Sequence, residues 1–340
     1  MQINRAMIVL AAGAVLFAGA LPAQAQKQTL RMAYWAGPAH QMVQTQEAWA
    51  KAVAEASGGN LTIEIDKAPL AKPEGQYDLI KNGVRDLVWH IPAYTPGRFD
   101  MMRVVEAPFT CPNATVCSTL LWRWYAKYNL AEKEFTDGTA LVNTFTTGPF
   151  LLHFTKPART LEEMRVLKLR MAGASVPIGK ALGFAIVALP ATDAYETLQR
   201  GTVDGTAFPW EAIPSFRLAE LVKFHLEIPG GILAAAFMIV GNKKAIDNLT
   251  PSNKAAFWKA SGEAGSLLYG KAWDAADERG RADAKQRGNI IETIAPAELE
   301  RWRPLLQFAT DEWVAKAKAK GLDGQKMLDD LKAMIKAASS

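Results

Sequence analysis

Apolar and polar residues alternate near the start of the chain in the pattern of strands separated by helices. Residues 30–34 and 61–65 each place apolar side chains at every second position, which predicts two half-buried strands. Residues 40–56 between them have a helical pattern that ends at a pair of glycines. A helix over residues 73–82 and a short apolar strand over residues 87–89 complete an order that is typical of parallel α/β units.

The middle of the chain continues in the same style. Strands are expected over residues 142–145 and 150–155, around a Gly-Pro turn, and Thr160 can cap the helix that follows. Thr192 and Asp193 are candidate caps for a later helix. The other predicted elements are strand 167–171, helix 176–182, strand 186–189, helix 193–200 and strands 205–208 and 235–240. This part of the chain therefore also predicts an α/β arrangement.

The last third of the chain has a helical pattern almost throughout. Thr250 followed by Pro251 is a strong helix start, and no further proline occurs until Pro296. One helix over residues 251–287 would be about 55 Å long, enough to bridge two lobes, although its glycines permit a kink or a break. Two more helices are expected at the end of the chain, over residues 297–320 and 323–338.

Residues 1–25 have the anatomy of a secretory signal peptide. Arg5 is followed by an apolar stretch over residues 6–21 and then by Ala23-Gln24-Ala25, a small-residue cleavage site. An uncleaved anchor is the alternative, but the cleavage site favours removal. The mature chain would begin near Gln26 and work in the periplasm, since no later apolar run is long enough to cross a bilayer.

Length, charge and cysteine content narrow the class of protein. Removal of the signal peptide leaves about 315 residues, which is enough for about two domains. The formal charge of +5 is small and spread among acidic residues, so nucleic-acid binding is not expected. Cys111 and Cys117 favour a disulfide in an oxidising compartment, because a metal site would lack further ligands. We expect no metal and no cofactor.

Motifs of the common catalytic sites are absent from the sequence. No G-x-S-x-G, H-E-x-x-H, Walker or G-x-G-x-x-G pattern occurs, and the four histidines lie far apart. A structural role is the more frequent outcome for each histidine. His90 stands out because it follows Trp89 at the C-terminal end of a strand, where open α/β sheets bind ligands.

Arg170 is the clearest candidate for a ligand-binding residue in the strand pattern. It lies near the end of strand 167–171, and a guanidinium there can hold a carboxylate through two parallel hydrogen bonds. On spacing alone, a solvated or ion-paired surface arginine is the more common case. The interpretation of Arg170 as a ligand anchor therefore depends on the rest of the chain.

Several ordered segments carry a family pattern, and they are spread along the chain. They are residues 58–63 (GGNLTI), 83–87 (GVRDL), 94–99 (YTPGRF), 107–109 (APF), 167–170 (LKLR) and 198–205 (LQRGTVDG). With these segments in this order, the whole mature chain resembles the solute-binding proteins of tripartite ATP-independent periplasmic (TRAP) transporters, the DctP-like family. The motif arginine, which takes the substrate carboxylate in that family, falls on Arg170.

The resemblance implies an α/β periplasmic-binding-protein-like fold with two lobes, a hinge and a long lobe-bridging helix. It places residues 26–148 and 236–270 in the first lobe, and residues 149–235 and 271–340 in the second. The chain is then expected to be a binding protein rather than an enzyme. It would act as a monomer that closes on a small organic acid and delivers it to the small and large membrane subunits of a TRAP transporter.

Two departures from the family pattern bear on the ligand. Several members carry an asparagine in the loop after Asp204-Gly205, where this chain reads TAFPW, and members that bind sialic acid have a further arginine where Phe150 stands here. Both changes replace polar groups by aromatic ones, which favours a monocarboxylate with an apolar or aromatic body. Each aromatic side chain could instead belong to the core. The predicted ligand-binding residues are Arg170, Trp89, Phe208, Phe150, Trp210, His90 and Trp35.

Other functions remain open at this point. A C4-dicarboxylate or a 2-oxo acid would fit if His90, His153 or Lys72 supplied a second positive charge. A secreted enzyme that acts on an organic acid, with His90 as its base, is an alternative of a different class. A binding protein that serves a sensor or another class of transporter is a third.

Overall fold

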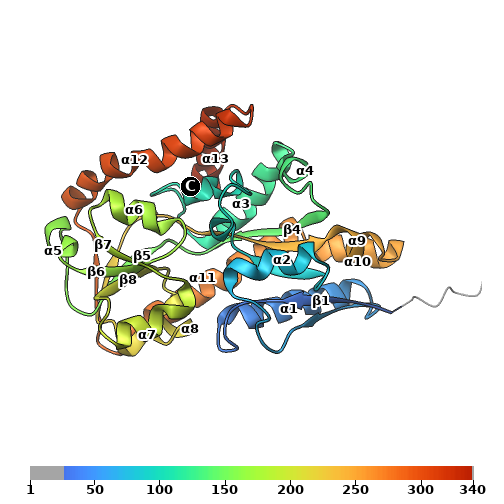
Figure 1. The fold of residues 1–340 in the computed structure, drawn as a ribbon, viewed down its shortest axis with the longest axis horizontal. Helices are drawn as coiled ribbons and strands as arrows, with labels where there is room; N and C mark the ends of the chain where they lie inside the picture. The colour runs from blue at the N-terminus through green and yellow to red at the C-terminus, as the bar shows by residue number, and fades with distance from the viewer. Residues whose placement is uncertain (1–26, 339–340) are drawn as a thin grey trace, which may run out of the picture.

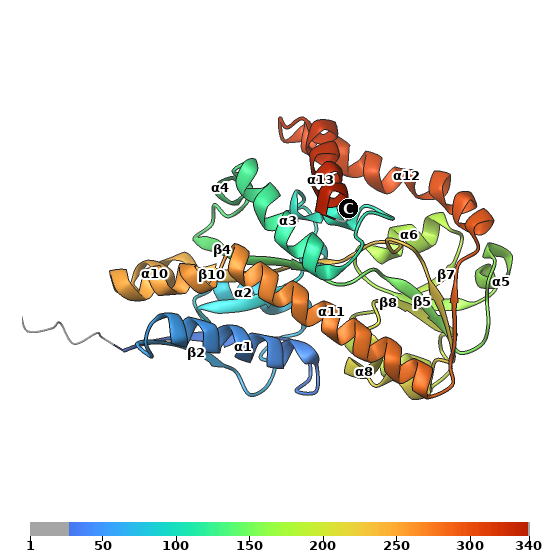
Figure 2. The same cartoon turned by 180° about the vertical axis from the view of Figure 1, so that it is seen from behind.

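A computed structural model describes residues 27–338, which form two mixed β-sheets with helices on their faces (Figure 1). The predicted signal peptide lies outside the described residues. Each sheet and the helices around it make up one lobe, and the two lobes lie side by side in Figures 1 and 2. The predicted two-lobed α/β fold is confirmed.

The first lobe is built on a five-stranded sheet. Its order is β2 (Leu61–Ile65), β1 (Gln28–Ala33), β3 (Leu87–His90), β10 (Ala236–Asn242) and β4 (Thr139–Thr146). β1 pairs in parallel with β2 and β3, whereas β10 is antiparallel to β3 and β4. Leu30 and Met32 of β1 are buried while Arg31 is exposed, as the alternation predicted.

The second lobe is built on a six-stranded sheet. Its order is β11 (Ile290–Thr293), β9 (Phe224–Glu227), β5 (Leu151–Phe154), β8 (Gly205–Phe208), β6 (Lys168–Met171) and β7 (Ala185–Ala188). The sequence pattern predicted four of these strands but not β9 and β11. Those two strands pair with each other in parallel at one edge of the sheet, 63 or more residues apart in the chain. Their pairing is long-range, so local periodicity gives little sign of it.

Two of the segments that connect the lobes are neighbours in space. Residues 147–150 lead from β4 to β5, so the Gly-Pro turn joins strands of different sheets, and residues 228–235 lead back from β9 to β10. The two segments hydrogen-bond to each other, because Thr147 N–H donates to Ala235 O at 3.0 Å and Phe150 N–H donates to Leu233 O at 2.8 Å. The paired segments form the hinge.

The predicted helix over residues 251–287 is two helices. α10 (Pro251–Ala260) ends before Gly262, which has a φ of 63°, and α11 (Glu263–Gln286) begins immediately after it. The break therefore falls at one of the glycines that permitted it, because a residue with a positive φ interrupts the helical hydrogen bonds. Gly262 also lies against Trp122, so that a Cβ at this position would come within 2.8 Å of the indole ring. α11 alone still runs along both lobes (Figure 2).

The chain ends in the helix pair that the sequence predicted. α12 (Pro296–Ala319) lies beside α6 (Ser175–Ala181) of the second lobe, and α13 (Gly324–Ala338) packs on α3 (Ala114–Lys127) of the first lobe. Trp124 Nε1 on α3 donates a hydrogen bond to Met327 O on α13 at 2.8 Å. We therefore propose that α13 belongs to the first lobe, in place of the second lobe to which residues 271–340 were assigned.

The other helices are short, apart from α1, and three predicted capping residues can be checked at the starts of α5 (Leu161–Arg165) and α7 (Ala194–Gln199). Thr160 and Glu163 form a capping box at the start of α5. Neither Thr192 nor Asp193 caps α7 with its side chain, because the chain enters α7 through a 3₁₀ turn that leaves Asp193 in the helical region. The remaining helices are α1 (Gln41–Ala56), α2 (Gln76–Lys81), α4 (Leu130–Glu134), α8 (Ala212–Ser215) and α9 (Lys243–Asp247).

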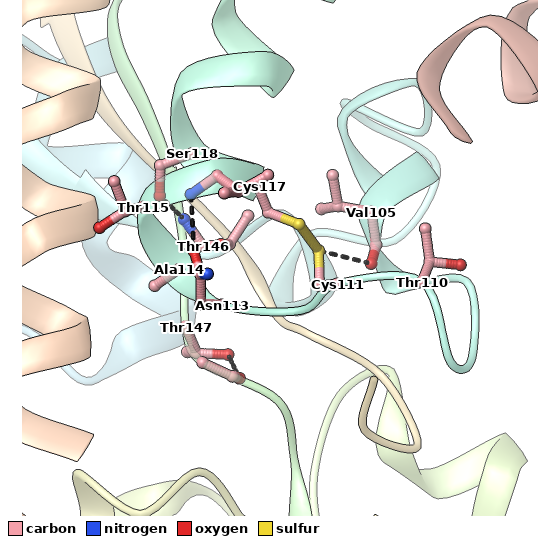
Figure 3. Close-up of a disulfide and its surroundings, with 12 residues drawn as sticks. Val105, Thr110, Cys111, Asn113, Ala114, Thr115, Cys117, Ser118, Thr146 and Thr147 are labelled. Atoms are coloured by element: carbon pink, nitrogen blue, oxygen red, sulfur yellow. Dashed lines mark hydrogen bonds between the residues drawn. A yellow bond between two sulfur atoms is a disulfide. The ribbon is translucent and has the colours of Figure 1, made fainter. Parts of the chain in front are cut away.

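Cys111 and Cys117 form a disulfide at the start of α3, as the sequence favoured (Figure 3). Asn113 lies in the closed loop and caps α3 by accepting the Val116 N–H at 2.8 Å. On the next turn, Ser118 Oγ accepts the Thr146 N–H at 2.9 Å. The disulfide thus closes the loop before α3, and the Ser118 hydrogen bond ties the first turns of α3 to the end of β4, where the first hinge segment begins.

Candidate ligand-binding site

A cavity with a volume of about 60 Å³ lies between the two lobes. Trp35, Trp89 and Phe237 line it from the first lobe, and Trp273 of α11 adds a further wall. Because residues of both lobes meet there, a molecule in this cavity contacts both lobes at once. The second lobe contributes Phe150, Arg170 and Phe208 to the same lining.

Arg170 is buried at the edge of this cavity and only 1% exposed. Its Nε donates a hydrogen bond to Leu189 O at 2.9 Å, which fixes the plane of the guanidinium. The guanidinium carbon lies 4.5 Å from the centroid of the Phe208 ring, in cation–π geometry. Its Nη2 has no hydrogen-bond partner among residues 27–338.

The positive charge of Arg170 has no ion-pair partner within residues 27–338. Burial lowers the pKa of Arg170 to about 10, and the nearby Tyr94 and Asp193 counteract only part of this effect. The side chain therefore remains charged at neutral pH, although no Asp or Glu of the described chain forms an ion pair with it. A buried unpaired charge costs several kcal/mol. An anion that entered the cavity would remove this cost.

Aromatic rings form the walls around the guanidinium. The rings of Trp35 and Trp89 are stacked with centroids 4.2 Å apart, and those of Phe208 and Phe216 are stacked at 5.4 Å. The imidazole of His40 lies between these two pairs, 5.5 Å from Trp89 and 5.1 Å from Phe216. The cavity therefore combines one cation with a largely apolar, flat-sided interior, which suits a planar acid.

The structure brings together five of the seven predicted residues and places two elsewhere. Trp35, Trp89, Phe150, Arg170 and Phe208 line the cavity. The other two, His90 and Trp210, do not.

His90 follows Trp89 on β3, and successive side chains of a strand point to opposite faces of the sheet. It lies beside Tyr77 and Phe99, and its Nε2 is 2.9 Å from Thr95 Oγ1. The indole of Trp210 packs on His225 and donates a hydrogen bond to Glu227 Oε1 at 3.1 Å. We therefore leave His90 and Trp210 out of the proposed site.

The side chains considered as a second cation also lie outside the cavity lining. His153 is buried against His225, with the two Nδ1 atoms 2.7 Å apart, and burial lowers the pKa of His153 well below its ordinary value. Lys72 is exposed and lines a separate surface depression. Within residues 27–338, Arg170 is the only arginine or lysine that lines this cavity.

Sequence reasoning missed several residues of the cavity. His40, Tyr94, Glu211, Phe216 and Trp273 all line it but belong to segments that are far apart in the chain. His40 was recognised only as the start of a helix, where its Nδ1 accepts the Met42 N–H at 3.2 Å. The only local signal for Glu211 was an acidic residue directly after TAFPW, the segment that departs from the family pattern.

Known proteins share both the sequence pattern and this architecture. Residues 32–317 match the profile of bacterial extracellular solute-binding protein family 7, DctP. The chain belongs to this family. A curated relative is the outer membrane transporter protein TsaT of Comamonas testosteroni, with 24% identity over 332 residues that cover 96% of this chain and 98% of the relative.

Solved structures of the DctP family resemble this one over nearly the full chain. A TRAP periplasmic solute-binding protein of Bordetella bronchiseptica with bound (R)- and (S)-mandelate has 29% identity and a TM-score of 0.87, covering 92% of this chain and 99% of that one. A TRAP solute-binding protein of Rhodoferax ferrireducens with copurified benzoate has 30% identity and a TM-score of 0.84 over the same shares.

None of the helices in residues 27–338 has the length and apolar content needed to cross a membrane. The same residues contain no group of three or more His, Cys, Asp or Glu side chains that could hold a metal ion.

Buried titratable groups of this DctP family member should give its stability a maximum near pH 6.5. Burial lowers the pKa of His40 and His90 to about 3 and that of His225 to about 4, so these side chains bind fewer protons in the folded state than in the unfolded state. Stability therefore rises with pH up to the unfolded-state pKa of about 6.5. Burial raises the pKa of Glu211 and that of Asp277 to about 8, so the folded protein keeps protons that the unfolded chain has released, and stability falls as the pH rises from 6.5 to about 8.

Thermal unfolding between pH 4 and pH 9 measures the rise in stability below pH 6.5 (the acid limb) and the fall above it (the alkaline limb). We expect the midpoint to fall by about 5 °C between pH 6.5 and pH 9. Glu211→Gln, which cannot ionise, should remove about half of the alkaline loss of stability, since Asp277 titrates in the same range, and should leave the acid limb in place. An unchanged alkaline limb in this variant would contradict the assignment to Glu211.

Proposed function

We propose that this protein captures a monocarboxylate with an aromatic or apolar body in the periplasm and delivers it to the membrane subunits of a TRAP transporter. The observation that carries the proposal is the buried, unpaired guanidinium of Arg170 at the edge of a cavity with aromatic walls. One carboxylate would pair with Arg170 through charge-assisted hydrogen bonds, and the rest of the acid would lie among the rings.

Closure of the two lobes follows from this arrangement. A ligand that touches both lobes only in the closed state stabilises that state. Burial of about 150 Å² of apolar ligand surface contributes roughly 4 kcal/mol, and the charge-assisted bonds contribute a comparable amount. A micromolar dissociation constant corresponds to about 8 kcal/mol, so both contributions are required.

The ligands of related structures support an aromatic acid. Mandelate and benzoate are bound in the two solved structures described above. A marine metagenome TRAP solute-binding protein specific for aromatic acids, 26% identical with a TM-score of 0.83, holds 3-hydroxybenzoate. Arg170 is the single arginine or lysine in the cavity lining, which supports a monocarboxylate, because a C4-dicarboxylate would leave one carboxylate buried without a partner.

A binding role fits the position of the histidines better than an enzymatic one. His90, the base of the enzymatic alternative, lies outside the cavity lining and is buried against Tyr77 and Phe99. Burial also lowers the pKa of His90 to about 3, far from the value that suits a general base near neutral pH. We accordingly propose that the ligand leaves the protein unchanged, and that the protein acts as a monomer.

Mass spectrometry of the acid released from the purified protein, followed by calorimetry, tests this function. We expect an acid with one carboxyl group and an apolar or aromatic body, a micromolar dissociation constant for benzoate, and no binding of succinate. Recovery of a dicarboxylate, or chemical conversion of the acid during incubation, would overturn the proposal.

A further inference from the structure

A second group of polar side chains lines the same cavity at a distance from Arg170. His40 begins α1 in the first lobe, and Glu211 immediately precedes α8 in the second, so the two lobes meet at this pair. His40 is 3% exposed and Glu211 is 1% exposed. The Phe208 ring lies 4.5 Å from the guanidinium carbon of Arg170, Phe216 stacks on Phe208, and His40 lies against Phe216. A row of rings therefore separates the two polar groups, which occupy different ends of the cavity.

Hydrogen bonds fix the proton positions at this end. His40 Nδ1 accepts the Met42 N–H at 3.2 Å, so the ring proton of the neutral imidazole lies on Nε2. His40 Nε2 lies 3.5 Å from Glu211 Oε1, which also accepts the Ser215 hydroxyl at 2.5 Å. Glu211 Oε2 has no hydrogen-bond partner among the described residues.

The His40–Glu211 pair is uncharged near neutral pH. Burial lowers the pKa of His40 to about 3 and raises the pKa of Glu211 to about 8. Asp277, whose Oδ1 accepts the Glu211 N–H at 2.6 Å, adds to the increase, and Arg279 opposes it. Since Oε1 already accepts a hydrogen bond, the carboxyl proton belongs on Oε2. This end of the cavity thus offers a hydroxyl donor without a net charge.

Three tryptophans with unpaired indole nitrogens lie around His40. The Nε1 atoms of Trp35, Trp89 and Trp273 are buried and have no hydrogen-bond partner within residues 27–338. Their rings lie around His40, with centroids at 6.0 Å, 5.5 Å and 6.4 Å from the imidazole. Most buried polar groups in proteins are paired, so a cluster of unpaired donors at one cavity indicates a ligand that brings acceptors.

We propose that Glu211, with His40 and the surrounding indoles, binds an uncharged hydroxyl group on the side of the ligand opposite its carboxylate. This inference rests on the proposed function and narrows the ligand to a hydroxylated aromatic acid. A hydroxyl oxygen can accept from the Glu211 carboxyl group and donate to a neighbouring oxygen. A second carboxylate would find no cation at this end, and a bare ring would leave the donors unpaired.

Calorimetry with positional isomers tests the proposal. Benzoate is compared with its ortho-, meta- and para-hydroxy derivatives on the wild-type protein at pH 7. We expect the meta or the para isomer to bind at least tenfold more tightly than benzoate. The ortho isomer should show no such gain, because its hydroxyl lies next to the carboxylate and close to Arg170.

Variants of Glu211 test whether this residue causes the preference for a hydroxylated ring. The quantity compared is the ratio of the hydroxybenzoate affinity to the benzoate affinity within each variant. Glu211→Leu should reduce this ratio to about one, whereas Glu211→Gln keeps a donor and should retain most of it. His40→Phe gives a second, independent reduction if Glu211→Leu fails to fold. Glu278→Leu, at an exposed position of α11, serves as the control and should keep the wild-type ratio.

The possible failures are distinguishable. If benzoate binds and all three isomers bind no more tightly, or if Glu211→Leu keeps the full ratio, the hydroxyl subsite is wrong while the proposed function stands. If none of the four acids binds, the aromatic ligand is wrong as well, and both proposals fall.

Discussion

Arg170→Met is expected to weaken benzoate binding by at least 100-fold and to leave the ligand-free protein as stable as the wild type or more stable. The loss of binding follows because both charge-assisted hydrogen bonds to the carboxylate disappear, which corresponds to about 3 kcal/mol or more. The unchanged or increased stability follows because Arg170 is buried without an ion-pair partner, and methionine removes that desolvation cost at a similar side-chain length. Calorimetry with benzoate and thermal unfolding of the ligand-free protein measure the two effects.

Arg165→Met is the matched control for this experiment. Arg165 lies in the same lobe and its Nε also donates to a main-chain oxygen, that of Leu182 at 2.9 Å, but its side chain does not line the cavity. This variant should bind benzoate with the wild-type affinity. Retention of benzoate binding by Arg170→Met to within threefold would remove Arg170 as the anchor, and with it the physical basis of the proposed function.

Gly280→Ala is expected to destabilise the protein by about 3 kcal/mol, although alanine is the better helix former. Gly280 lies on α11 where this helix crosses the second lobe, and a Cβ there would be 2.2 Å from Trp210 O and 2.8 Å from Trp210 C. These are main-chain atoms, which cannot rotate away as a side chain can. Trp210 is also held next to α11 through Glu211, whose N–H donates to Asp277 Oδ1 at 2.6 Å. The helix must therefore move away from the lobe.

Chemical denaturation measures the change in the free energy of unfolding. The sign of that change distinguishes a steric clash with residue 210 from an effect of helix propensity. Helix propensity alone would make Gly280→Ala more stable by about 1 kcal/mol. Ala282→Gly, at an exposed position of the same helix, reports propensity alone and should cost about 1 kcal/mol. A Gly280→Ala protein as stable as the wild type would show that α11 does not pack closely on residue 210.

Much of the secondary structure could be predicted because its signals are local. The alternation over residues 61–65 reappears as β2 and the capping box at Thr160 as the start of α5. Two rings of the predicted pocket, Trp89 and Phe208, came from the ends of predicted strands. Such patterns extend over a few residues, so the sequence contains the whole signal.

The features that local patterns did not decide depend on contacts outside their own segments. α10 and α11 separate at Gly262, which packs against Trp122 about 140 residues earlier in the chain. His90 is adjacent to a pocket residue but points to the other face of its strand, so proximity in sequence gave the wrong side. α13 lies on α3 because apolar faces far apart in the chain bury each other.

The sequence by itself determined the order of strands and helices, the family pattern and the single arginine expected to take a carboxylate. Only the tertiary structure decided that this arginine is buried without an ion-pair partner, and that His40 and Glu211 meet at the other end of the cavity. The physical reason is that charge compensation depends on distances between residues that the chain separates by more than one hundred positions. Local periodicity reports which residues share a face, but only folding places two faces against one cavity.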